Sequence, residues 1–259
     1  MQLIVIQPDI VWEDRQVNFD AVERLLATDP PESGALIVLP EMFSVGFTMN
    51  VAAVAEEESG PTERFLGAVA RTYDAAVIGG VVGRRADGRG ANQAVALGPD
   101  GAVLARYAKL HPFSFAGEHE HYVSGEEIVL FEWGGFRVAP FVCYDLRFPE
   151  IYRVALRRGA DLYVTIANWP ASRVHHWETL IVARAIENQC YSVGVNRSGS
   201  DPNVAYPGRS LVIDPRGDQV AAAGPAESVI KIQLSPDEVR AYRASFPVLN
   251  DVRPDFLGA

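Results

Sequence analysis

The sequence predicts an α/β protein built as a four-layer α-β-β-α sandwich of two mixed sheets. Its apolar runs of strand length lack polar alternation, as expected of strands that are buried on both faces. These runs alternate with segments of helical spacing, and each half of the chain has the same order of strand, helix, strand and proline–glycine hairpin. Two similar layers, each a sheet with its helices, would therefore pack sheet to sheet.

Proline and glycine mark the predicted elements of the first half. Pro61 precedes a helix, where its missing N–H has no helical partner. Two glycines within the strand at 75–82 indicate a close approach of backbones, and the turn 98–101 (GPDG) closes a hairpin. The expected elements are strand 3–7, helix 18–27, strand 35–39, helix 62–73, strand 75–82 and hairpin strands 93–97 and 102–107.

The second half repeats this order, and its hairpin turn at 214–217 (DPRG) has similar chemistry. The expected elements are strand 137–142, helix 151–158, strand 162–166, helix 173–190, strand 191–195, hairpin strands 210–213 and 219–222, strand 229–234 and helix 236–244. Because no linker divides the halves, we expect one domain over residues 1–259.

Composition argues against several classes of partner. The 259 residues carry a net charge of −10, whereas nucleic acids and anionic membranes attract basic surfaces. We find no apolar run of membrane-spanning length and no secretory leader. The two cysteines, Cys143 and Cys190, stand in different contexts, so we expect free thiols in a reducing, cytoplasmic setting.

Three ionisable residues follow the ends of predicted strands: Glu41, Lys109 and Cys143. Each has an ordinary alternative, namely a solvated cap, a surface charge and a small buried hydrophobe. Sites in open α/β sheets form at the carboxyl ends of strands, which favours a shared site. Cys143 also precedes a predicted helix start, where a thiolate can be stabilised.

These residue types suit amide hydrolysis. Cys143 would attack a carbonyl carbon and form a thioester. Glu41 would take the thiol proton, protonate departing ammonia and activate water, a contribution on the order of 10² to 10⁴ in rate. Lys109 and the backbone N–H of Tyr144 would stabilise the oxyanion, each by roughly 3 kcal/mol.

The chain resembles the nitrilase superfamily of carbon–nitrogen hydrolases over nearly its whole length. The segments that carry the resemblance are 40–50 (PEMFSVGFTMN), 142–150 (VCYDLRFPE), 168–173 (NWPASR) and 183–189 (ARAIENQ). The resemblance implies a nitrilase-like sandwich, a triad of Glu41, Lys109 and Cys143, and a further catalytic glutamate, Glu118, that contacts the lysine. Within the superfamily the sequence is most similar to bacterial omega-amidases.

The resemblance further implies a small terminal amide as substrate, 2-oxoglutaramate or 2-oxosuccinamate, and neither cofactor nor metal. It implies a homodimer or higher homo-oligomer, with the tail from about residue 247 at the interface. The loop 200–206 departs from the family pattern, because it carries Pro-Asn-Val where a glycine-rich turn is expected. This loop is expected to border the pocket and to affect substrate size.

A keto acid carboxylate favours an arginine partner. We expect Arg173 to bind it, with Trp169 and Phe43 as pocket walls. Arg147 is a second arginine near the predicted site, and a structural salt bridge is its alternative role.

Other readings remain open. Another amidase of the superfamily, acting on deaminated glutathione or an N-carbamoyl compound, is the first alternative, and a non-catalytic binding module is the second. Cys143 with His111 could form a thiol–imidazole pair. The segment 118–121 (EHEH) resembles a metal site but lacks the further ligands that zinc requires, so we expect solvated histidines there.

Overall fold

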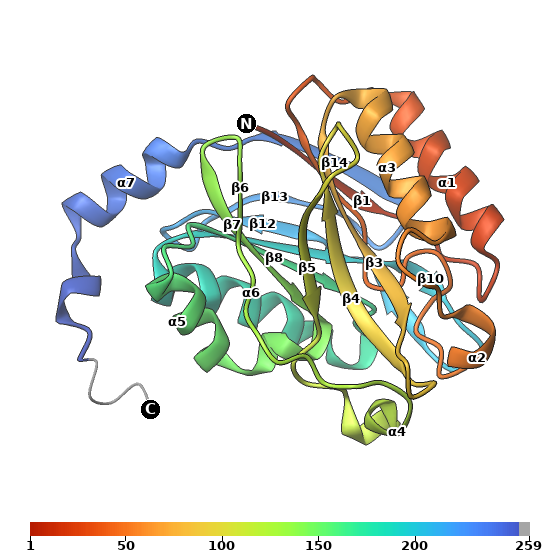
Figure 1. The fold of residues 1–259 in the computed structure, drawn as a ribbon. Coiled ribbons are helices and arrows are strands. Elements are labelled where there is room, and N and C mark those ends of the chain that lie inside the picture. The colour runs from red at the N-terminus through yellow and green to blue at the C-terminus, as the bar shows by residue number, and fades with distance from the viewer. Residues whose placement is uncertain (254–259) are drawn as a thin grey trace.

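The computed structural model describes residues 1–253, in which two six-stranded mixed sheets pack face to face (Figure 1). The first sheet contains, in spatial order, β14 (Ser228–Gln233), β1 (Gln2–Gln7), β2 (Leu36–Val38), β3 (Ala76–Arg84), β4 (Gly90–Leu97) and β5 (Val103–Ala108). The second contains β6 (Phe131–Trp133), β7 (Phe136–Val142), β8 (Leu162–Ala167), β9 (Tyr191–Asn196), β12 (Leu211–Ile213) and β13 (Gln219–Ala222). In both sheets the second, third and fourth strands are parallel, and antiparallel strands flank them. This shared order confirms the predicted repeat.

Helices cover the outer face of each sheet, which confirms the four-layer prediction (Figure 1). The first sheet carries α1 (Arg15–Thr28) and α3 (Pro61–Tyr73), and the second carries α5 (Pro149–Arg157) and α6 (Val174–Asn188). Proline occupies the start of α3 and of α5, where it is favourable. The shorter elements are α2 (Val51–Val54), α4 (Glu118–His121), α7 (Pro236–Ser245) and the ribbon of β10 (Ser198–Ser200) with β11 (Ala205–Pro207).

The two faces of β1 explain its unbroken apolar sequence. Leu3 and Val5 belong to the core that lies between the sheets and extends under α5 and α6. Ile4 and Ile6 point the other way, into the core under α1 and α3. Because side chains alternate between the faces of a strand, burial on both faces requires apolar residues at every position.

Several element ends differ from the sequence-based expectation. The long helix expected at 173–190 is Val174–Asn188, because a 3-10 turn, Ala171–Arg173, precedes it and Gln189 adopts a left-handed conformation at its end. The three-residue strands β6, β10 and β11 were not expected, since they are too short for a periodic pattern. Within residues 1–253, no helix is long and apolar enough to cross a membrane.

Candidate active site

Glu41 follows β2 and is fully buried. Its Oε2 accepts the backbone N–H of Asn168 at 2.8 Å, and the side-chain amide of Asn168 donates to the Glu41 carbonyl at 2.7 Å. Gly80 of β3 lies against this turn, and a Cβ there would fall 2.1 Å from the backbone N of Met42. The expected close approach of backbones is thus confirmed. Together with the bonds from Asn168, it fixes the position of Glu41 between the two sheets.

The ammonium of Lys109, which follows β5, bridges two carboxylates. Its Nζ lies 3.0 Å from Oε1 of Glu41, and 3.0 and 2.8 Å from the two carboxylate oxygens of Glu118. Glu118 is the first residue of α4 and also accepts the backbone N–H of Phe113 at 2.5 Å. The three charged side chains are at most 1% exposed, and buried charges of this kind require such partners.

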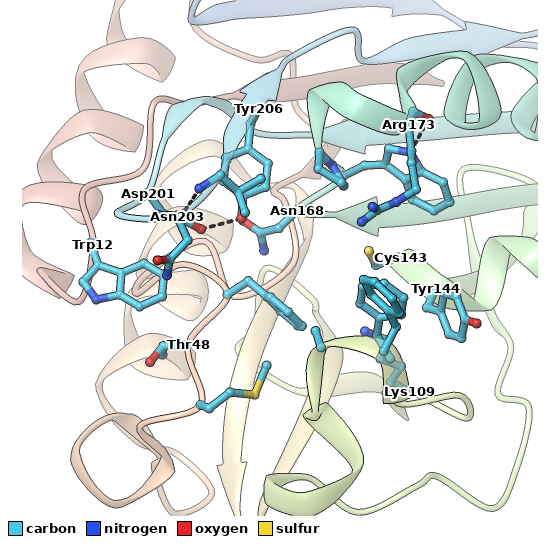
Figure 2. Close-up of a pocket in the computed structure, with 18 of the residues that line it drawn as sticks. Trp12, Thr48, Lys109, Cys143, Tyr144, Asn168, Arg173, Asp201, Asn203 and Tyr206 are labelled. Atoms are coloured by element: carbon cyan, nitrogen blue, oxygen red, sulfur yellow. Dashed lines mark hydrogen bonds between the residues drawn. The ribbon is translucent and has the colours of Figure 1, made fainter.

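Cys143 follows β7 and starts a 3-10 helix, Cys143–Arg147. Its backbone φ is +48°, which is uncommon for a residue with a side chain and typical of functional sites. The residue is partly exposed and its sulfur faces an open cavity (Figure 2). Tyr144, the expected second oxyanion donor, follows directly and lines the same cavity.

Burial and the nearby carboxylates favour the protonated form of this thiol. Burial raises the pKa of Cys143, and the negative charge of Glu41 raises it further, against the opposing effect of Lys109. Burial also acts to raise the pKa of Glu41, but Lys109 and hydrogen bonds from Asn92 and Asn168 lower it overall. The raised pKa favours a neutral thiol in the resting chain over the thiolate expected at a helix start, because burial comes first and the two carboxylates add to it.

The buried carboxylate of Asp145 ties the turn after β7 to the segment after β5. It accepts the phenol of Tyr107 at 2.8 Å, the backbone N–H of His111 at 3.0 Å and that of Val142 at 3.2 Å. The Nδ1 of His111 lies 2.8 Å from the same carboxylate, and its ring stacks on Phe148. The imidazole is thus engaged with Asp145 and Phe148.

A cavity of about 660 Å³ opens above the sulfur, and Trp12, Asp201 and Asn203 lie at the end remote from Cys143 (Figure 2). The loop 200–206 borders it, as the sequence suggested. The residues that line it are Trp12, Glu13, Phe47, Thr48, Met49, Asn50, Lys109, Phe113, Phe115, Ala116, Cys143, Tyr144, Arg147, Asn168, Trp169, Pro170, Arg173, Asp201, Asn203, Val204 and Tyr206.

Two arginines line this cavity close to Cys143. The guanidinium of Arg147 lies over the indole of Trp169, with its Cζ 4.8 Å from the ring centroid. That of Arg173 lies over Phe113 at 5.4 Å, and the Trp169 indole N–H donates to the Arg173 carbonyl at 2.7 Å. Burial, followed by the charge of Arg173, lowers the pKa of Arg147. An anion between these cations would relieve their repulsion.

Phe43 does not hold the position that we expected. Its side chain is 0% exposed and packs with the rings of Phe19 and Phe65 in the core under α1 and α3. Phe47, four residues later, lines the cavity, with its ring centroid 5.4 Å from Nζ of Lys109. The turn after β2 reverses the chain between them, which a sequence pattern does not reveal.

The histidines do not gather into a ligand set. His119 and His121 are exposed on α4, and among the described residues no group of three or more His, Cys, Asp or Glu is arranged to hold a metal ion. Cys190 is fully buried in the core.

Two asparagines that the sequence analysis did not place in the site contact Glu41. Asn168 directly follows β8 of the second sheet, and its backbone N–H and side-chain amide both donate to Oε2 of Glu41. Asn92 lies in β4, where every residue is buried. The available signal was a pair of adjacent amides, Asn92 and Gln93, at the start of an apolar run, because polar side chains at the positions of a buried strand need a partner.

Comparisons with known proteins agree with this geometry. The profile of the carbon-nitrogen hydrolase family matches residues 3–244. The omega-amidase YafV of Yersinia enterocolitica is 41% identical over 253 residues, which cover 97% of this chain and 96% of that protein. The 2-oxoglutaramate amidase of Bacillus subtilis is 32% identical over 251 residues, with 96% of each chain covered.

Solved structures of related proteins have the same fold over nearly the whole chain. The protein XC1258 of Xanthomonas campestris, described as a CN-hydrolase superfamily protein with an arsenic adduct in its active site, has a TM-score of 0.90 and 36% identity, covering 100% of this chain and 99% of that one. A mutant of the amidase from Nesterenkonia sp. AN1, described as showing the Michael addition of acrylamide at its active-site cysteine, has a TM-score of 0.83 and 25% identity, covering 97% of this chain and 100% of that one.

Proposed function

Because the chain belongs to the carbon–nitrogen hydrolase family of the nitrilase superfamily, we propose that it is an omega-amidase. Its substrate would be the terminal amide of a small 2-oxo acid, 2-oxoglutaramate or 2-oxosuccinamate. The observation that carries the proposal is the ammonium of Lys109 clamped between Glu41 and Glu118 beside the Cys143 thiol. Two relatives that match over nearly their full length, an omega-amidase and a 2-oxoglutaramate amidase, support the substrate class.

Acylation begins with a neutral thiol and an ionised Glu41. As the sulfur of Cys143 bonds to the amide carbon, its proton passes to Glu41. Lys109 and the backbone N–H of Tyr144 stabilise the oxyanion, each donor contributing roughly 3 kcal/mol. Glu41 then gives the proton to the amide nitrogen, the C–N bond breaks, and ammonia leaves a thioester behind.

Deacylation repeats these transfers with water. Glu41 takes a proton from the water that attacks the thioester, the C–S bond breaks, and the proton returns to the sulfur. Glu118 keeps the position and charge of Lys109 through both halves, because its two oxygens lie 3.0 and 2.8 Å from Nζ. Glu41 suits the role of base better than His111, whose ring is engaged with Asp145 and Phe148.

The substrate carboxylate would bind Arg173, with Arg147 as its neighbour and Trp169 as a pocket wall. Both guanidinium groups line the cavity near Cys143, and a planar guanidinium suits a carboxylate. This anion would also offset the repulsion between the two arginines.

A panel of amides assayed for ammonia release tests the function. We expect the two 2-oxo acid amides to show the highest kcat/KM and the Cys143→Ala variant to be inactive. Preference for deaminated glutathione or for an N-carbamoyl compound would assign the chain to another activity of the superfamily. Binding without turnover of any amide would support a binding module.

We also propose a cytoplasmic homodimer or higher homo-oligomer formed by a single domain over residues 1–259. The segment that carries α7 leads away from the sandwich (Figure 1) and places Phe246 in an exposed position. The expected interface tail begins near residue 247, and its part at 254–259 lies outside the described residues. Light scattering on the full chain and on one ending at residue 246 tests this proposal, since loss of the tail should favour the monomer.

A further inference from the structure

The amide of Asn92 contacts both buried carboxylates of the site. Its Nδ2 donates to Oε1 of Glu41 at 2.7 Å and to Oε1 of Glu118 at 2.9 Å. The same two oxygens each lie 3.0 Å from Nζ of Lys109. Asn92 is 1% exposed and lies on β4, so a neutral donor and a cation bridge the same pair of oxygens.

The orientation of this amide follows from its surroundings. Both of its neighbours are carboxylate oxygens, which only the NH₂ side can satisfy. Its Oδ1 is buried and finds no hydrogen-bond partner among residues 1–253. An unsatisfied buried acceptor destabilises the fold, which indicates that the position is kept for the two bonds that the NH₂ group donates.

We propose that Asn92 is a positioning residue that keeps the proton shared by Glu41 and Cys143 on the sulfur in the resting enzyme. The inference rests on the proposed function. Two protonation states are in equilibrium: the proton lies either on the sulfur of Cys143, or on an oxygen of Glu41, which gives a thiolate and a carboxylic acid. The bond from Asn92 stabilises the ionised carboxylate and so opposes this transfer. Catalysis then begins from an ionised base instead of a thiolate that would be alkylated or oxidised at rest.

Other groups around Glu41 do not replace this bond. Asn168 holds the other oxygen, Oε2, through its backbone N–H. Arg147 and Tyr152 interact electrostatically with Cys143, and burial keeps the Tyr152 phenol neutral. The charge of Glu118 acts on Lys109 and Cys143, and the titratable groups that interact with Glu41 itself are Lys109, Cys143, Tyr122 and Tyr206. The phenols donate to the Thr48 carbonyl and to Asp201 and stay neutral, because burial raises the pKa of each.

Two measurements on Asn92→Leu test the proposal, because leucine has a similar volume but no donor. At neutral pH, Cys143 should react with iodoacetamide about tenfold faster, since loss of one bond to a carboxylate shifts protonation by about one pKa unit. The acid limb of kcat/KM for 2-oxoglutaramate should move to higher pH by a similar amount. A variant that is only loosened would instead lose activity uniformly with pH.

Gln93→Leu is the matched control. Gln93 is the next residue of β4 and is also a buried amide, but it faces the opposite side and accepts from Arg106 at 3.2 Å. It should change neither measurement. If Asn92→Leu does not fold, the same two measurements are made on Asn92→Ser, which removes the NH₂ group that donates to both carboxylates but keeps a polar atom.

Unchanged alkylation and an unchanged acid limb in the folded Asn92 variant would overturn the inference. Alkylation needs no substrate, so the role of Asn92 is read independently of the proposed activity. Failure of the wild-type chain to release ammonia from any amide would refute the proposed function and leave the alkylation result standing.

Discussion

The phenol of Tyr107 donates a hydrogen bond of 2.8 Å to the carboxylate of Asp145, and both side chains are fully buried. Tyr107 belongs to β5 of the first sheet, whereas Asp145 follows β7 of the second. This bond joins the two sheets directly beside the residues that carry the proposed chemistry. It therefore links the stability of the sandwich to the placement of Lys109 and Cys143.

Tyr107→Phe removes this bond and should lower the free energy of unfolding by about 1.5–3 kcal/mol, because the acceptor is charged. Tyr163→Phe is the control, since the Tyr163 phenol donates 2.8 Å to a neutral acceptor, the Tyr152 carbonyl. We expect about 0.5–1.5 kcal/mol there. Denaturant unfolding measures both, and an equal loss in the two variants would contradict the special role of Asp145.

Glu118→Gln should lower kcat for the keto acid amide by about 10²-fold. The substitution keeps the shape of the side chain but removes one of the two charges that hold Lys109, and a displacement of a catalytic group by about 1 Å has an effect of this size. Glu120→Gln changes an exposed carboxylate on the same short helix and should leave kcat unaltered. Steady-state kinetics decide, and equal rates for the two variants would remove Glu118 from the mechanism.

Arg173→Ala should raise KM for 2-oxoglutaramate and lower kcat/KM about 10- to 100-fold, as expected for one charge-assisted hydrogen bond. A neutral amide of similar length, which offers no carboxylate, should show little change. The same pair of substrates on Arg147→Ala separates the two arginines. If KM for the keto acid amide stays constant in Arg173→Ala, this arginine does not bind the carboxylate.

Cys143 should react with iodoacetamide before Cys190 does. The pKa of each thiol is raised, chiefly by burial, but Cys143 is partly exposed on the cavity whereas Cys190 is fully buried, so access of the reagent separates them. Mass spectrometry of tryptic peptides after brief alkylation measures the order. Adding urea to the unfolding midpoint should make the two thiols react alike, and faster labelling of Cys190 in the folded chain would refute the assignment.

Cys190 should also make stability depend on alkaline pH. Its folded pKa of about 12 lies above the unfolded value of 9.0, so its contribution is complete below pH 9.0 and declines as pH rises above that value. The slope contributed by one such thiol is at most about 1.4 kcal/mol per pH unit. Urea unfolding of wild type and Cys190→Ala should show the smaller decline in the variant. Parallel curves would contradict this origin.

Local chemistry allowed much of the site to be predicted from the sequence. Glu41, Lys109 and Cys143 each follow a strand, and the structure brings them together because those strands end on the same side of the paired sheets. Phe43 shows where prediction from the sequence fails. The residue was predicted to be a pocket wall, yet the turn after β2 places its ring in the core and brings Phe47 to the cavity.

The sequence by itself determined the layers, the repeat and the residues proposed to react, because periodicity and strand ends are local properties. Only the tertiary structure decided which way the pKa of the thiol moves, since this depends on its burial and on the charges from distant segments that meet around it. The clamp of Asn92 on Glu41 and Glu118 joins residues that are 51 and 26 positions apart. Contacts of this kind arise from the folding of β4 against its neighbours, and no local pattern encodes them.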